Sequence, residues 1–235
     1  MSKRNYRNNL ELIEKGFIAC WHNSQDLVKG AKLLFDNFLH AQALSLSVLA
    51  LEELGKLICI DGLLFAHATG HKADRFAKSL KSHSQKLSAF EVFPFLLGNI
   101  AEIDPRYQTE TGFKQALAIG LNDLKARGNQ VMGMLGSGGF DDLDKWKQYG
   151  FYTQPRNSTF IKPNDAVSRE VAEAVFMLAW RASSSLDFYL KKGNLERYIE
   201  FARNVRSKLT EAEHQEIERE SKVIVDELFQ NGESV

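Results

Sequence analysis

Three charged residues interrupt an apolar helical segment, and they are the first candidates for chemistry in this chain. Glu52, Glu53 and Lys56 lie within residues 40–71, where leucine and isoleucine side chains surround them. A charge is costly to bury without a partner, so each needs an ion pair or a hydrogen bond. The four-residue spacing of Glu52 and Lys56 favours a pair on one helix face, with Glu53 directed elsewhere. The three residues form either a structural ion pair or a polar site within a helix bundle.

A second polar stripe follows, and it carries groups that could move a proton and stabilise an anion. His83 and Lys86 fall close to Arg75 on one flank of a predicted helix. Histidine, with an ordinary pKa of about 6.5, is suited to proton transfer at neutral pH. Lysine and arginine stabilise phosphate charge. The alternative is a buried salt-bridge network that fixes helix register. The candidate catalytic residues are Glu52, Lys56, Arg75, His83 and Lys86.

A basic and aromatic stretch over residues 145–156 is the candidate RNA-binding surface. Aromatic rings can stack on single-stranded bases while lysine and arginine contact the phosphates. An aromatic lid packed onto the bundle is the other interpretation of this stretch. The candidate RNA-binding residues are Lys145, Trp146, Lys147, Tyr152 and Arg156.

Hydrophobic spacing predicts an all-α fold that would hold these residues. The predicted fold has a bundle over residues 1–193 and a charged C-terminal helical hairpin over 194–235. A glycine-rich segment, 128–140, is predicted to be a flexible loop because it fits neither a phosphate loop nor a dinucleotide fingerprint. The predicted bundle helices cover residues 8–38, 39–69, 72–98 with a kink or end at Pro94, 109–127, 141–149, and a last helix capped by Asn164 or Asp165 that ends at Gly193.

Composition limits the partners and the compartment. The 235 residues include 30 basic and 30 acidic side chains, so no global field draws the protein to nucleic acid or membrane. No long uncharged apolar run occurs, and we expect a cytoplasmic protein with no membrane partner. Cys20 and Cys59 are expected to be core thiols. Histidine and carboxylate spacings are incomplete as metal sites, so no metal and no other cofactor is expected.

Three segments together resemble the AbiV family of abortive-infection proteins, which is grouped with the HEPN superfamily. They are LALEELGK at 49–56, the H-x-x-K pattern of His83 and Lys86, and the aromatic segment KQYGFYTQP at 147–155, with Pro163 following. The likeness covers roughly residues 20–190. It implies a HEPN-like helical bundle, a homodimer, and a role in prokaryotic defence against phage, in a superfamily whose members are often metal-independent RNases.

The chain departs from the nuclease signature of that superfamily, an arginine followed by histidine after four to six intervening residues. Arg75 precedes His83 by one position too many, and the residue at an accepted spacing is Lys78. The resemblance to the AbiV family itself implies an antiviral protein that arrests host growth, by RNA cleavage or by translation inhibition. The alternative is a non-catalytic interaction module, switched by a phage or host protein or by an antitoxin-like partner.

Overall fold

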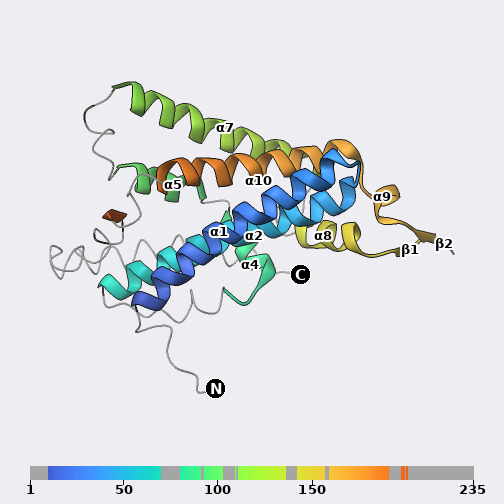
Figure 1. Ribbon diagram of the computed structural model, residues 1–235, viewed down its shortest axis with the longest axis horizontal. Coiled ribbons are helices and arrows are strands. Elements are labelled where there is room, and N and C mark those ends of the chain that lie inside the picture. The colour runs from blue at the N-terminus through green and yellow to red at the C-terminus, as the bar shows by residue number, and fades with distance from the viewer. Residues whose placement is uncertain are drawn as a thin grey trace, which may run out of the picture.

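A computed structural model describes residues 10–69, 80–90, 93–102, 111–135, 142–156 and 159–190, together with residues 109, 197, 198 and 200. Within these residues the chain is helical except for one short antiparallel hairpin (Figure 1). The all-α prediction is therefore confirmed. The elements are α1 (Leu10–Asp36), α2 (His40–Thr69), α4 (His83–Phe90), α5 (Phe93–Glu102), α7 (Thr111–Leu135), α8 (Leu143–Phe151), β1 (Gln154–Arg156), β2 (Thr159–Ile161), α9 (Pro163–Ala166) and α10 (Arg169–Tyr189).

Helix α2 is the centre of the bundle. It packs most extensively against α1, and further against α10, α4 and α8. A helix that is covered on several sides needs apolar residues around its circumference, which explains why leucine occurs on all faces of α2. Leu44, Leu51, Leu54 and Leu57 are all fully buried. The polar residues of α2 must therefore meet partners on the helices that cover it.

The predicted helices over 8–38 and 39–69 are confirmed as α1 and α2. Phe38, two residues after the end of α1, has a positive φ of 62°, and the chain turns back there. Asn164 at the start of α9 holds this corner, because its side-chain oxygen accepts a hydrogen bond from Ala41 N at 3.2 Å. The corner is thus fixed by a residue more than a hundred positions away in the sequence.

The predicted helix over 72–98 is wrong as one continuous element. Residues 80–82 are not helical, and α4 begins only at His83. Pro94 lies in the first turn of α5, where its missing N–H leaves no helical hydrogen bond unmade. The part of the prediction that covers residues 72–79 falls outside the described residues. His83 therefore stands at the first turn of a short helix.

The glycine-rich loop was predicted too early in the chain. Helix α7 continues through Gly128 to Leu135. Leu117, Leu124 and Val131 recur every seven residues and are all buried, so a continuous apolar face holds this helix together. Packing along that face outweighs the low helix propensity of glycine. Residues 136–141 lie outside the described part of the chain.

The cap of the last bundle helix was also assigned wrongly. Ser168, rather than Asn164 or Asp165, caps α10, and its hydroxyl accepts a hydrogen bond from Val171 N at 3.3 Å. Val167, just before it, is buried and separates α9 from α10. The short helix α9 thus belongs to the corner that precedes α10.

Most of the predicted hairpin over 194–235 lies outside the described residues. Tyr198 is described, is buried, and donates its hydroxyl hydrogen bond to the Asp61 carboxylate of α2. Burial raises the pKa of Asp61 to about 6, although the Tyr198 hydrogen bond opposes that rise. A segment beyond α10 therefore packs on the same central helix as the candidate site.

Neither cysteine forms a disulfide. Cys59 is buried and Cys20 is partly buried. Cys20 packs against the hydrophobic core, so both thiols face the core as predicted. Burial raises the pKa of each thiol to about 12. No helix among the described residues is long and apolar enough to span a bilayer.

Candidate functional site

A buried carboxylate on α2 organises the candidate site. Glu52 is only 2% exposed, yet three basic groups from two other helices reach it. Its Oε2 lies 2.6 Å from His83 Nδ1 and 3.6 Å from Lys86 Nζ, both on α4. Its Oε1 accepts a hydrogen bond from Lys147 Nζ of α8 at 2.6 Å. The structure thus brings together Glu52, His83 and Lys86 of the predicted catalytic set and adds Lys147.

Two glycines allow the flanking helices to approach α2 closely on either side of Glu52. A Cβ atom on Gly55 would lie 1.8 Å from the backbone oxygen of Lys86. A Cβ atom on Gly150 would lie 2.0 Å from Ser45 Oγ. Ser45 Oγ also donates a hydrogen bond to Lys147 O at 2.7 Å, which fixes α8 beside α2. The glycine of the EELGK segment and the glycine of the KQYGF segment therefore position the basic residues on Glu52.

Lys56 has a different partner from the predicted one. It forms an ion pair with Glu53, three residues before it, rather than with Glu52. Glu53 faces α1, where its negative charge contributes to the raised pKa of Cys20 after the larger effect of burial. The predicted four-residue pair does not form, because Lys56 pairs with Glu53 while α4 and α8 supply the partners of Glu52. Lys56 thus belongs to a separate ion pair on the side of α1.

Lys147 joins both carboxylates of the site. Its Nζ lies 2.6 Å from Glu52 Oε1 and 2.5 Å from Asp144 Oδ1, three residues before it on α8. Burial alone would lower the pKa of Lys147, but hydrogen bonds to Asp144 and Glu52 outweigh burial and raise the pKa. Lys147 is therefore a protonated, doubly bound ammonium at neutral pH.

The contact with Glu52 fixes the tautomer of His83. A carboxylate can only accept hydrogen bonds, so the 2.6 Å contact requires His83 Nδ1 to carry a proton. Lys147 Nζ lies 3.4 Å from the same Nδ1, a longer contact at which the nitrogen is not an acceptor. The Nε2 lone pair of the neutral ring is then available for a substrate proton. The His83 side chain is 57% exposed, so the ring can meet a ligand from solvent.

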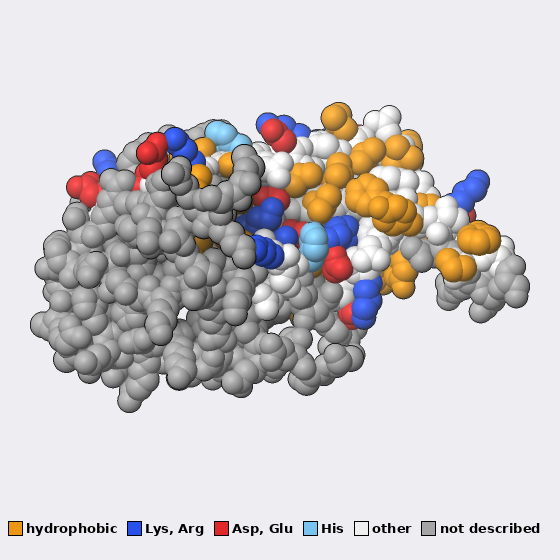
Figure 2. Space-filling model, turned by 90° about the horizontal axis from the view of Figure 1, so that it is seen from below, with side chains coloured by type: hydrophobic (Ala, Val, Ile, Leu, Met, Phe, Trp, Pro, Cys, Tyr) orange, Lys and Arg blue, Asp and Glu red, His pale blue; other side chains and the backbone are white. Residues whose placement is uncertain are grey.

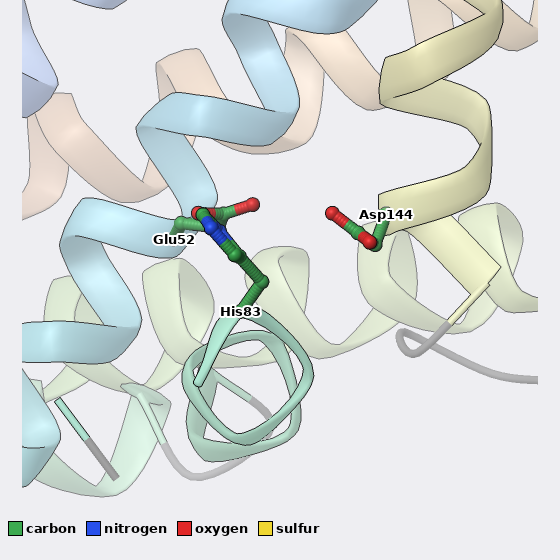
Figure 3. A group of neighbouring side chains, drawn as sticks. All are labelled: Glu52, His83 and Asp144. Atoms are coloured by element: carbon green, nitrogen blue, oxygen red, sulfur yellow. The ribbon is translucent and has the colours of Figure 1, made fainter. Parts of the chain in front are cut away.

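Glu52, His83 and Asp144 together could hold a metal ion. One ligand atom from each lies within 4.8 Å of the others, and Figure 3 shows Asp144 on α8 facing the other two across the site. Histidine nitrogen and carboxylate oxygen are ordinary ligands for transition metals. The Lys147 ammonium, however, contacts both carboxylates, so a cation already stands among these donors. A metal would have to displace Lys147.

The remaining candidate residues do not join this cluster. Lys145 is exposed and pairs with Asp142 at 2.8 Å, and Trp146 packs on the core with its ring edge-on to Tyr149. Tyr152 is 65% exposed. Arg156 lies in β1, opposite Thr159. Arg75 falls outside the described residues.

Sequence reasoning missed Asp144 and the two close-approach glycines. Asp144 and Lys147 are spaced three apart, which is a signal for a pair on one helix face. That signal was not separable from the neighbouring pair Asp142 and Lys145, which has the same spacing and lies at the surface. A tertiary contact distinguishes the two pairs, because Lys147 is the lysine of the two that the Glu52 carboxylate of α2 contacts.

Comparison with known families matches residues 12–183 to the HEPN-type AbiV family. No curated protein and no solved structure gave a significant match. The matched region begins in α1, ends in α10, and includes every described residue of the Glu52 cluster. Since this match covers well over half of the sequence, the chain belongs to the AbiV family of HEPN proteins.

Proposed function

We propose that the chain arrests the growth of phage-infected cells by cleaving RNA at the Glu52 cluster, without a metal. Membership of the AbiV family indicates a role in abortive infection. The observation that supports the chemistry is a solvent-facing histidine whose inner nitrogen is bonded to a buried carboxylate, with two lysines beside it. Such a group has the orientation of a general base or acid.

The proposed reaction is transfer of a phosphate within the RNA chain. The 2′-hydroxyl oxygen forms a bond to the adjacent phosphorus while the bond from phosphorus to the 5′-oxygen breaks. His83 Nε2 takes the proton of the 2′-hydroxyl, and the leaving 5′-oxygen takes a proton from water. The imidazolium then gives its proton to the resulting hydroxide, which restores neutral His83 and water. Glu52 stabilises the imidazolium that forms, because it already bonds to Nδ1. The products are a 2′,3′-cyclic phosphate and a free 5′-hydroxyl.

Lys147 and Lys86 are the cations proposed to stabilise the charge that develops on phosphorus oxygens. Lys147 is the more accessible of the two, since its side chain is 11% exposed and that of Lys86 is 6% exposed. A preorganised ammonium in a site with little water stabilises a developing anion more than it would in bulk solvent. We therefore propose that Lys147 contacts the phosphate directly. Lys86 adds positive charge from a more buried position, beside Glu52.

The test is RNA cleavage by His83→Ala, with His22→Ala as the matched control. His22 is an exposed histidine of α1 whose ring packs at a tilt against Trp21, and it lies outside the cluster. Total RNA and transfer RNA are incubated with each purified protein, and growth arrest is scored on expression. We expect His83→Ala to lose cleavage and growth arrest with a nearly unchanged thermal midpoint. Full activity in a well-folded His83→Ala protein would overturn the proposal.

A second candidate function is a non-catalytic interaction module. Large hydrophobic side chains are exposed at the end of the molecule that carries the α1–α2 corner, α8 and the hairpin. Figure 2 shows hydrophobic side chains spread over part of the described surface. Phe38, Tyr152 and Phe160 are each exposed by 65% or more. Exposed apolar patches mark sites where proteins associate. Growth arrest that survives His83→Ala would favour this function.

We further propose that the chain forms a homodimer. The exposed apolar residues at this end would be covered by a second copy through two-fold packing, the commonest arrangement of soluble oligomers. Light scattering at micromolar concentration should then give about twice 26.6 kDa. A monomer at every concentration would refute it.

A further inference from the structure

Asp144 stands at the open side of the Glu52 cluster. Its side chain is 31% exposed, whereas those of Glu52 and Lys147 are 3% and 11% exposed. Its Oδ1 lies 2.5 Å from Lys147 Nζ, and its Oδ2 accepts a hydrogen bond from Gln148 at 3.4 Å. Asp144 therefore occupies the position from which a phosphate oxygen would reach Lys147.

The charges of the cluster balance when Asp144 is included. Glu52 and Asp144 carry the negative charges, Lys86 and Lys147 carry the positive charges, and His83 is neutral when its Nδ1 alone is protonated. Among the described residues of the cluster, an anionic ligand thus meets no excess of positive charge. Without Asp144 the same cluster would carry a net positive charge and would attract a phosphodiester.

We propose that Lys147 is the phosphate-binding residue of the site and that Asp144 competes with the phosphodiester for it. A single-stranded polynucleotide binds when Lys147 exchanges its hydrogen bond to Asp144 for one to a phosphate oxygen, while its bond to the deeper Glu52 is kept. Asp144 is a positioning residue that acts through Lys147 and restrains the site. This inference rests on the function proposed above, because it gives that function its substrate class.

The chain offers a matched control at the start of the same helix, where Asp142 is the N-cap residue of α8. Asp142 and Lys145 form an ion pair of the same three-residue spacing at 2.8 Å, and the Lys145 side chain is 73% exposed. Asp142→Asn and Asp144→Asn therefore remove the same charge from α8, two residues apart. Only Asp144→Asn releases a lysine that belongs to the Glu52 cluster. A difference between the two variants reports on the site rather than on overall charge.

The probe is a fluorescently labelled single-stranded oligodeoxynucleotide, which lacks the 2′-hydroxyl and cannot undergo the proposed cleavage. We expect Asp144→Asn to tighten its binding about tenfold, as loss of a competing charged hydrogen bond implies. We expect Asp142→Asn to tighten it by no more than about twofold, since exposed charges are screened. In the double variant with Lys147→Gln, Asp144→Asn should no longer tighten binding.

The salt dependence of binding supplies a readout that a purely structural role would not change. In wild type the exchange leaves the Asp144 carboxylate free to take up a cation, which offsets the counterion released from the phosphate. Asp144→Asn has no such carboxylate, so its slope of log affinity against log salt should be steeper by about 0.7 than that of wild type. This measurement uses only those two proteins, so it decides the question even where Lys147→Gln does not fold. Equal effects of Asp144→Asn and Asp142→Asn, an unchanged salt slope, or no binding by any variant would each overturn the proposal.

Failure of this proposal is distinguishable from failure of the proposed function. Tighter binding through Lys147 in a protein that cleaves no RNA would support the phosphate site and refute the nuclease. RNA cleavage that depends on His83, with binding unaffected by Asp144→Asn, would support the nuclease and refute the competition.

Discussion

Replacing Gly55 with alanine is expected to disrupt the site without touching any of its charged groups. The new Cβ would lie 1.8 Å from Lys86 O, whereas ordinary van der Waals contact begins at 3.4 Å. The difference, 3.4 − 1.8 = 1.6 Å, is the local separation that α2 and α4 would have to undergo. If that shift reached the side chains, the 2.6 Å contact of His83 with Glu52 would lengthen to 4.2 Å and no longer be a hydrogen bond.

The expected cost follows from this clash. Overpacking of a close contact costs about 1–3 kcal/mol, because backbone atoms cannot rotate away as a flexible side chain can. Gly120→Ala is the matched control, since it lies within α7 and a Cβ there meets nothing within 4 Å. A helical glycine with open space for a Cβ is expected to stabilise by about 0.5–1 kcal/mol when replaced by alanine. The two substitutions are thus expected to change stability in opposite directions.

Urea unfolding followed by circular dichroism measures both changes. We expect Gly55→Ala to lower the free energy of unfolding and to lower RNA cleavage by as much as His83→Ala does. We expect Gly120→Ala to raise the free energy of unfolding and to leave cleavage unchanged. Equal stability of the two variants would refute the view that Gly55 is required for the approach of α4.

Further substitutions test the ion pairs, the buried acid and the cation site. Glu52→Ala removes the carboxylate that Lys86 pairs with and leaves Lys147 with Asp144 alone, so it should lower the free energy of unfolding by about 3–5 kcal/mol. Lys56→Ala, from a more exposed pair, should lower it by about 1 kcal/mol or less, and equal losses in urea unfolding would contradict this. Because the pKa of Asp61 is raised to about 6 in the folded state, its protonated form stabilises the fold at low pH, and that contribution is lost as pH rises from about 4 to 6. Asp61→Asn should remove this fall, and an identical pH dependence in both proteins would disprove the assignment. Lys147→Ala should expose the three metal donors and bind Zn²⁺ in a calorimetric titration more tightly than wild type does; no difference would count against Lys147 as the resident cation.

The sequence predicted the helices whose apolar faces are long and continuous. α1 and α2 agree with their predicted ranges within a few residues, because the burial of α1 follows the apolar periodicity of its sequence and α2 is apolar around its circumference. α7 was predicted too short, since Gly128 and Gly133 suggested a loop while the buried face through Val131 continued. Local propensity and tertiary packing disagreed there, and packing decided the outcome.

The centre of the site could be predicted, but its partners could not. Glu52 was identified as a charge within an apolar helix, and His83 as part of a polar flank of the following helix. The two side chains are in contact. The predicted partner of Glu52 was Lys56, the nearest lysine along the helix, whereas the observed partners come from α4 and α8. Sequence spacing describes contacts within one helix and contains no direct signal for contacts between helices. Lys147 was therefore placed on an RNA-binding surface rather than in the Glu52 cluster.

The chemical identity of the cleaved RNA ends tests the proposed mechanism most directly. An RNA oligonucleotide that wild type cleaves is prepared again with a single 2′-O-methyl group at the scissile position, and the products of both are examined by mass spectrometry. We expect a 2′,3′-cyclic phosphate and a 5′-hydroxyl from the unmodified RNA, no cleavage at the modified position, and no products with His83→Ala. Cleavage of the modified RNA, or products with a 5′-phosphate, would contradict attack by the 2′-hydroxyl at the Glu52 cluster.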